Sequence, residues 1–294
     1  MKACTRTTSK KIFCFAALLV LASYVGFAAD AKLEDILNHQ YKDRIYTLCQ
    51  PMTAPTQQYD SLGNSPTASV MGPWTIYGRV LIKKIKLEPN RVILEAQRIG
   101  MKFDGATGAL VPIKLKNTVT LEISVNQPLE SAAQFHAILG RIFAFSREDF
   151  IASLPDFWRV YAQHYLKTYS GDGTTIEFGI SEATLKTRKE PPSKTTVEGE
   201  QLGPSHRVTA PQPKSVPDPQ YTQAASALGL QGTVVLKTTV DESGRIRDVQ
   251  LVRPLGLGLD ESAAMTVKNW AFNPGTRDGS PVKVELTVEV AFRQ

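Results

Sequence analysis

Cysteine is scarce in this sequence, and its scarcity excludes two kinds of covalent or metal support. Only three of the 294 residues are cysteine, and Cys4 and Cys14 fall in an apolar N-terminal stretch. Since Cys49 is the only cysteine beyond that stretch, no internal disulfide and no cysteine-based zinc site can form there. We expect Cys49 to be either a small buried apolar residue or an unpaired thiol.

Motifs typical of enzymes and metal sites are also missing. The sequence has no His-Glu-x-x-His pair, no Gly-x-Ser-x-Gly elbow and no Gly-Lys-Ser/Thr phosphate loop. Gly256 and Gly258 begin a dinucleotide-binding pattern, but Glu261 stands where its third glycine is needed. A calcium loop starting at Asp241 fails because Val252 replaces the bidentate glutamate. These absences predict a protein that is not an enzyme and that has no catalytic residues, metal site or cofactor.

The excess of positive charge is confined to the N-terminus. The formal net charge is +6, but four basic residues precede Asp30, the first acidic residue, so the chain downstream carries only about +2. A balance so close to neutral does not favour a nucleic-acid partner, which would require a basic surface.

The basic residues open a three-part N-terminal segment. A basic stretch ends at Lys11, and an uncharged apolar run occupies residues 12–29. With Ala28 and Ala31 as candidate cleavage positions, residues 1–31 have the layout of a secretory signal peptide. The alternative is an uncleaved anchor in the inner membrane, because about 18 apolar residues can just cross a bilayer. Both alternatives place the rest of the chain outside the cytoplasm, in the periplasm or cell envelope.

Composition then divides the chain into two folded domains and a linker. Residues 32–185 and 220–294 have the apolar content of folded domains, whereas residues 186–219 hold seven prolines among Lys, Thr, Ser and Gln. We expect this proline-rich linker to be extended and mobile and not to form β ladders.

The first domain is predicted to be an antiparallel β-meander with helices. Helical spacing indicates a helix over residues 33–48, and a polar loop follows over residues 51–72. Alternation predicts strands over residues 74–82, 91–103 and 119–125, with one face buried. Helical spacing returns over residues 132–142 and after Pro155. The aromatic residues clustered there either form core or line an apolar groove, and we expect core.

The second domain has the pattern of a small two-layer α+β module. Asp218 and Pro219 suit the start of a helix that Gly229 ends. Strands are predicted over residues 233–240, 245–252 and 282–292, with a bulge in the second because Ile246 and Val249 differ in parity. A second helix over residues 259–270 places Asp260 and Glu261 at its positive end. The module therefore has three antiparallel strands and two helices on their apolar face.

Four motifs in this module make it recognisable. They are Pro-x-Tyr at residues 219–221, Gln-Gly-Thr-Val at 231–234, Val-Asp-x-x-Gly-x-Ile at 240–246 and Asn-Trp-x-Phe-x-Pro at 269–274. In this order and spacing they resemble the TonB C-terminal domain family over about residues 212–294. The resemblance marks six structural positions: Tyr221, Gly232, Gly244, Trp270, Phe272 and Pro274. We expect Trp270 to be a buried anchor between helix and sheet.

The resemblance implies a partner and a place in the cell. Family members lie in the periplasm on a Pro-rich tether and grip a short TonB-box-like peptide of an outer-membrane transporter, driven by the ExbB–ExbD motor. Three features depart from the family. Thr222 stands where a proline often follows the motif tyrosine, and residues 12–29 lack the histidine that couples to the motor. The long first domain, residues 32–185, stands where a typical transducer has only tether. The resemblance therefore implies peptide binding in support of transmembrane transport, without establishing energy transduction.

An edge strand predicts where the partner binds. In the resembled family the last strand lies at a sheet edge, where an extended peptide can add by β-augmentation. The predicted partner-binding residues are Lys283, Val284, Glu285, Leu286, Thr287, Val288 and Glu289. The alternatives are that the linker or a second copy covers this edge, in which case the chain is a secreted two-domain adaptor or a self-associating homodimer.

Overall fold

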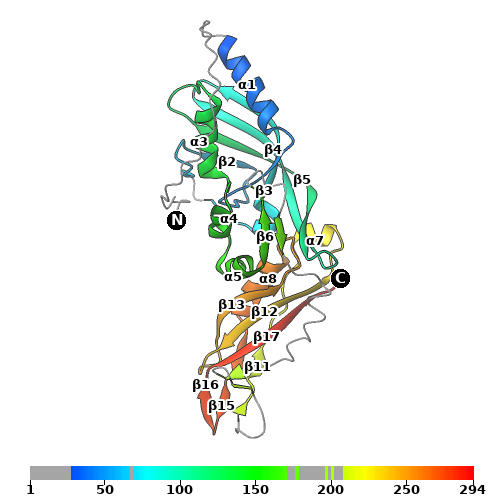
Figure 1. Cartoon of the computed structure of the whole chain (residues 1–294). Coiled ribbons are helices and arrows are strands. Elements are labelled where there is room, and N and C mark those ends of the chain that lie inside the picture. The colour runs from blue at the N-terminus through cyan, green and yellow to red at the C-terminus, as the bar shows by residue number, and fades with distance from the viewer. Residues whose placement is uncertain (1–27, 67–68, 171–175, 179–195, 198–199, 202–207) are drawn as a thin grey trace.

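The computed structural model describes residues 28–66, 69–170, 176–178, 196–197, 200–201 and 208–294, and these form an elongated α+β protein (Figure 1). The predicted fold class is confirmed. Most of the predicted signal segment lies outside these residues, and residues 28–31 belong to helix α1 (Ala28–Tyr41). No helix within the described ranges is both long and apolar enough to cross a membrane.

A five-stranded sheet forms the first part of the molecule. Its strand order is β1-β3-β4-β5-β2, in which every neighbouring pair is antiparallel except β5 and β2. The strands are β1 (Ile45–Thr47), β2 (Thr56–Tyr59), β3 (Arg79–Glu88), β4 (Arg91–Asp104) and β5 (Ala109–Ser124). The predicted meander corresponds to β3, β4 and β5, which follow one another in both sequence and space.

Three local predictions for this region are wrong. The helix predicted over residues 33–48 ends at Tyr41, because Asp43 adopts a left-handed φ of +58° and the chain then enters β1. The loop predicted over residues 51–72 contains β2, a short strand held by its parallel pairing with β5. Residues predicted to begin a strand at Trp74 instead form the short helix α2 (Trp74–Tyr77), which buries three consecutive side chains.

Two helices cover one face of this sheet (Figure 1). Helix α1 is fixed to β3 by Asn38, whose side chain bonds both the N–H and the carbonyl of Ile85. Helix α3 (Ala132–Ile142), predicted correctly, is joined to α1 by a 2.9 Å hydrogen bond between Tyr41 Oη and His136 Nδ1. Apolar side chains of both helices and of the strands beneath them form one core.

The aromatic region that follows forms core. It comprises α4 (Arg147–Ser153), α5 (Asp156–Tyr165), β6 (Leu166–Tyr169) and β7 (Ile176–Phe178). The fully buried Trp158 ring meets Trp74 and Tyr161 edge-on, with centroids 5.1 and 5.5 Å apart. Edge-to-face packing of this kind is favourable beyond the area it buries.

The C-terminal part is built on β12 (Gly232–Val240), β13 (Ile246–Arg253) and β17 (Val284–Phe292), in the order β13-β12-β17. Helices α7 (Gln223–Ala227) and α8 (Leu259–Lys268) contribute apolar side chains to the core beside these strands. The predicted bulge is present, since the register of β12 and β13 shifts between Lys237 and Thr239 and Asp248 has a φ of +42°. Three antiparallel strands and two helices match the predicted module.

Two predictions near the start of this part are wrong. The first helix begins at Gln223 and not at Pro219, because the Thr222 hydroxyl accepts the N–H of Ala225 and caps it there. Much of the predicted linker lies outside the described residues, and its described pieces do form short ladders. These pieces are β8 (Thr196–Val197), β9 (Glu200–Gln201), β10 (Val208–Thr209) and β11 (Gln212–Ser215). Strand β8 pairs with β17 and with β9. Strand β10 pairs with β15 (Gly275–Arg277), and β11 pairs with β14 (Ala271–Asn273). Strand β16 (Ser280–Val282) forms a hairpin with β15.

The two parts of the molecule are joined by backbone hydrogen bonds between β4 and the loop before α8. Phe103 donates to the carbonyl of Leu255 at 3.1 Å, and Leu257 donates to the carbonyl of Met101 at 2.8 Å. Gly256 lies between them with a φ of +87°, and a Cβ at this position would come within 2.3 Å of the Met101 carbonyl oxygen. Only glycine fits this approach, and a single apolar core continues across the contact.

Candidate functional site

The predicted partner-binding residues lie together along β17. Lys283 directly precedes the strand and the other six residues are the first six of its nine. Val284, Leu286 and Val288 face the core, whereas Glu285, Thr287 and Glu289 lie on the opposite face and are half-buried or exposed. In the strand order β13-β12-β17, the side of β17 that faces away from β12 is the edge of the three-stranded core.

Part of this edge is covered by the linker. Strand β8 pairs antiparallel with β17, placing Val197 opposite Val284 and Thr196 opposite Glu285. From Leu286 to Phe292, none of the described strands pairs with this side of β17. The edge is therefore closed at its beginning by a two-residue strand and is without a described strand partner over the remainder.

Charges on the exposed face of β17 are engaged with neighbouring strands. Glu285 forms an ion pair with Lys237 of β12 at 2.8 Å, and Lys283 lies 3.9 Å from a carboxylate oxygen of Asp248. Both pairs are well exposed to solvent, so they contribute little to stability. They place charges of opposite sign at Lys283 and Glu285.

Three of the six family-marked structural residues, Gly244, Phe272 and Pro274, lie in one close contact. Gly244 has a φ of +79°, and a Cβ there would lie 1.8 Å from the carbonyl oxygen of Phe272 and 3.6 Å from Pro274. The N–H of Phe272 donates to the Gly244 carbonyl at 2.9 Å. The turn after β12 and the segment after α8 therefore meet at a glycine. Gly232 serves a similar close approach, since a Cβ there would lie 2.7 Å from Leu255.

Two of the three aromatic residues of the set, Tyr221 and Trp270, hold the chain that enters the module. Tyr221 donates a hydrogen bond to the carbonyl of Leu230 at 3.1 Å, and its ring meets Phe292 edge-on at 5.4 Å. Trp270 donates from Nε1 to the carbonyl of Pro217 at 3.0 Å. The expectation of a buried Trp270 at a helix end is wrong: α8 ends at Lys268, and Trp270 is half-buried beyond it.

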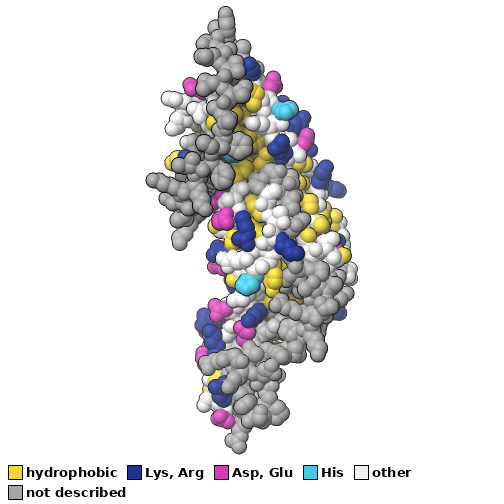
Figure 2. Space-filling view, viewed as in Figure 1, with side chains coloured by type: hydrophobic (Ala, Val, Ile, Leu, Met, Phe, Trp, Pro, Cys, Tyr) yellow, Lys and Arg dark blue, Asp and Glu magenta, His cyan; other side chains and the backbone are white. Residues whose placement is uncertain are grey.

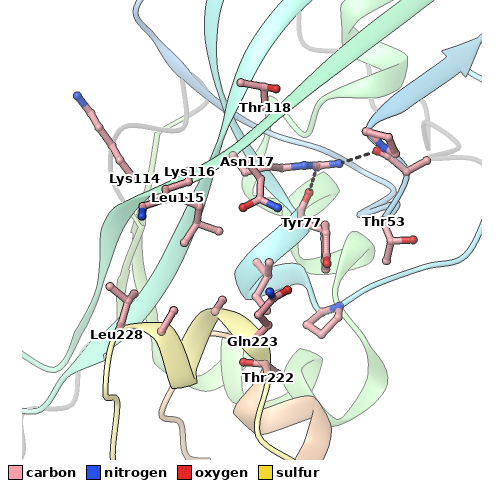
Figure 3. A pocket seen from close by; sticks show the side chains of 17 residues that line it. Thr53, Tyr77, Lys114, Leu115, Lys116, Asn117, Thr118, Thr222, Gln223 and Leu228 are labelled. Atoms are coloured by element: carbon pink, nitrogen blue, oxygen red, sulfur yellow. Dashed lines mark hydrogen bonds between the residues drawn. The ribbon is translucent and has the colours of Figure 1, made fainter.

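A cavity of about 530 Å³ lies where the first part meets the C-terminal module. One wall is α7 of the module, and the others come from α2, the loop at residues 53–55 and residues 114–118 of β5. In Figure 3, Leu115 and Asn117 point down from β5 toward α7, and Leu228 and Gln223 lie across from them. This cavity could not be predicted from the sequence, because α7 lies more than 100 positions from the other walls along the chain.

A buried guanidinium borders this cavity. Arg98 on β4 is only 2% exposed, and it donates to the carbonyls of Tyr77, Met52 and Ala54. It also lies over the Tyr77 ring, 5.3 Å from the centroid. Burial lowers the pKa of Arg98 to about 10, and the guanidinium remains charged at neutral pH.

Two acidic side chains are buried beside the joint, the backbone contact between β4 and the loop before α8. Asp260 accepts the N–H groups of Leu255 and Gly256 at 2.7 and 2.9 Å, which fixes the loop before α8. Burial raises the pKa of Glu261, and the neighbouring Asp260 charge raises it further. Both acids lie in the first turn of α8, as predicted, but the sequence did not indicate that they are buried. Across the described ranges, no three His, Cys, Asp or Glu side chains are grouped closely enough to hold a metal.

Comparison with known proteins identifies the C-terminal part. Residues 217–294 match the family described as Gram-negative bacterial TonB protein C-terminal. Protein TonB of Vibrio cholerae is 33% identical over 76 residues, which are 26% of this chain and 31% of that protein. Protein tonB2 of Pseudomonas aeruginosa is 32% identical over 78 residues, which are 26% of this chain and 29% of that protein.

The chain is also similar to the solution NMR structure of the Pseudomonas aeruginosa TonB CTD. It has 25% sequence identity and a TM-score of 0.26, and the match covers 29% of this chain and 88% of that one. The matched region spans less than a third of the two curated relatives. Residues 217–294 of this chain are a TonB C-terminal domain.

Proposed function

We propose that this protein works in the cell envelope, where its TonB C-terminal domain docks on an outer-membrane transporter by binding an extended peptide along β17. TonB family proteins are non-enzymatic and transport-associated, and they interact with outer-membrane transporters and with ExbB and ExbD. For this chain the transporter is the proposed partner. An interaction with ExbB and ExbD would in addition require an anchor in the inner membrane, and residues 12–29 are the candidate anchor.

The observation that carries this proposal is the edge of β17. An edge strand offers a row of backbone N–H and C=O groups to an added strand, and alternate side chains then provide specificity. Between Leu286 and Phe292 the described strands leave this row unpaired. A peptide that extends to Lys283 would also have to displace β8 from Val284 and Glu285.

The test measures binding of synthetic N-terminal peptides from the outer-membrane transporters encoded in the same genome. Neighbouring residues of a strand direct their N–H groups to opposite sides, so Leu286→Pro and Thr287→Pro remove donors from different sides of β17. The variant that loses the outward N–H should bind the peptide about tenfold or more weakly while keeping its fold. The other variant should break the β12 ladder and lower the melting temperature.

The matched controls are Leu286→Ala and Thr287→Ala, which keep both N–H groups. They should bind within about twofold of wild type if backbone pairing dominates. If neither proline variant weakens capture of any of these peptides, strand addition to β17 is wrong.

Export is part of the same proposal. We propose that residues 1–31 direct export, that residues 32–185 form a separate domain and that the proline-rich linker at residues 186–219 leads to the module. N-terminal sequencing of protein from membrane and soluble fractions should find chains beginning at Ala29 or Lys32. Retention of Met1 in a chain that resists extraction by salt and alkali would instead establish the anchored form.

A further inference from the structure

We infer that the cavity between α7 and β5 is a binding site for an amphiphilic organic anion, a small molecule with an acidic head and an apolar body. This site is separate from β17. Its walls belong to both parts of the chain, so a molecule bound there would contact the first domain and the TonB C-terminal domain at once.

The size of the cavity suits a small molecule. At about 530 Å³ it lies within the roughly 300–1,000 Å³ usual for ligand sites. Such sites are lined mainly by apolar groups, with a few polar groups that fix orientation. Nine of the 17 lining residues are apolar, with Ile76, Tyr77 and Leu115 on one side and the small residues of α7 on the other, and the remaining eight are polar or basic.

Leu228 is an apolar residue of the cavity wall that no other part of the described chain buries. This leucine follows α7 and lines the cavity, yet 51% of it is exposed. Figure 3 shows its side chain across the opening from Leu115. Figure 2 shows hydrophobic side chains gathered with Lys and Arg on this side of the molecule, over β5 and α7. An apolar ligand body placed between the two leucines would remove Leu228 from water.

The charges around the cavity select an anion. Three basic residues line it (Arg98, Lys114 and Lys116), and the lining contains no Asp or Glu. Arg98 is buried and donates its hydrogen bonds to neutral carbonyls, and within the described residues no carboxylate lies at ion-pair distance to offset its charge. Figure 3 shows Lys114 directed away from the cavity centre, which makes it a rim charge. Low-dielectric walls strengthen the attraction of such a charge for an acidic head.

Two amides supply polar contacts that do not depend on charge. Asn117 of the β5 bulge and Gln223 of α7 approach the cavity from opposite sides (Figure 3). Each carries both donors and an acceptor, so together they can bond an acidic head or a polar substituent. Because Gln223 belongs to the module and Asn117 to the first domain, a ligand held by both would favour the docked arrangement.

The test uses 8-anilinonaphthalene-1-sulfonate as the anionic probe and N-phenyl-1-naphthylamine, its uncharged counterpart of similar apolar body. Fluorescence titration of the full chain should show saturable binding of the anion at least about tenfold tighter than binding of the neutral probe. Leu228→Glu should weaken anion binding by about tenfold or more, and Lys116→Glu by about threefold or more.

Leu62→Glu is the matched control for Leu228→Glu, because Leu62 is 60% exposed and lies outside the cavity lining. It should leave binding unchanged, and melting curves should show that all three variants stay folded. Equal affinity for the two probes would overturn the anionic class. Binding of the anion that is unaffected by Leu228→Glu and Lys116→Glu would overturn the site itself.

Discussion

The N–H of Gly258 donates a 2.8 Å hydrogen bond to the side-chain oxygen of Thr75, a residue 183 positions earlier in the chain. Thr75 belongs to α2 in the first part of the molecule, and Gly258 caps α8 of the TonB C-terminal domain. Together with the backbone bonds of Leu255 and Leu257, this contact fixes the module against β4 and α2. The module is therefore packed on the first domain in addition to being linked to it.

Adding a side chain at Gly256 should break the contact between the loop before α8 and β4 and lower the stability of the protein. Gly256→Ala places a Cβ 2.3 Å from the Met101 carbonyl oxygen at a φ of +87°. We expect a loss of about 2–4 kcal/mol, from backbone strain together with the broken contact. Chemical denaturation of the full chain measures this loss, and limited proteolysis should show cleavage near the joint.

Gly279→Ala is the matched control for this substitution. Gly279 also has a left-handed φ, +83°, but nothing lies within 4 Å of its added Cβ. It should therefore show only the cost of the backbone conformation, about 1 kcal/mol. Equal losses for the two variants would mean that the approach to Met101 does not matter.

A buried acid makes stability depend on pH in an identifiable direction. Burial raises the pKa of Glu261 above its usual 4.5, so the folded protein holds this proton more tightly than the unfolded chain does. The resulting stabilisation is complete below the unfolded pKa and is lost as the pH rises through the folded one. Glu261→Gln cannot titrate, and the variant should match wild type near pH 4 but be more stable at about pH 9.

Urea unfolding at both pH values measures this difference. Each unit by which the Glu261 pKa is raised corresponds to about 1.4 kcal/mol. The control is Glu242→Gln at an exposed turn position, which should change neither value. If the difference in stability between Glu261→Gln and wild type is the same at both pH values, folding does not raise the pKa of Glu261.

The helices and strands that were predicted correctly from the sequence are those with a clear periodicity of apolar side chains. Strand β17 and helix α3 match their predicted periods because each has one face on the core. Helix α2 and strand β2 are too short to show a period, and they exist because β4 and β5 hold them.

Long-range contacts account for the features of the sites that were missed. The spacing of Gly256 and Gly258 suggested a failed nucleotide motif, whereas their role is to approach β4 and α2. The burial of Glu261 also depends on α2, so the helix-end expectation could not anticipate it. The seven residues predicted along β17 are adjacent in the chain, which is why they lie together, but their coverage by β8 could be read only from the pairing.

Trp270 should contribute less to stability than a buried tryptophan. It is half-buried, and its indole N–H reaches the Pro217 carbonyl. Trp270→Phe keeps most of the ring contact with the core and loses the hydrogen bond, for an expected cost of about 1 kcal/mol. Trp270→Ala should cost about 2 kcal/mol, below the roughly 3–5 kcal/mol of a fully buried ring. Thermal unfolding of the full chain distinguishes these values, and a loss above that range for Trp270→Ala would contradict the half-buried position.

Strand β8 should compete with the proposed peptide for the beginning of β17. Because β8 pairs with Val284 and Glu285, a peptide that reaches these residues must first displace it. Substituting both Thr196 and Val197 by proline removes whichever N–H faces β17, and should release the edge. The displaced strand has two residues, so its loss is worth about 1 kcal/mol and should tighten peptide binding about fivefold. The double alanine variant at the same positions keeps both N–H groups and should bind like wild type. If the proline variant binds no more tightly than the alanine one, the peptide does not extend over Val284 and Glu285, and the partner site is limited to the part of β17 from Leu286 onward.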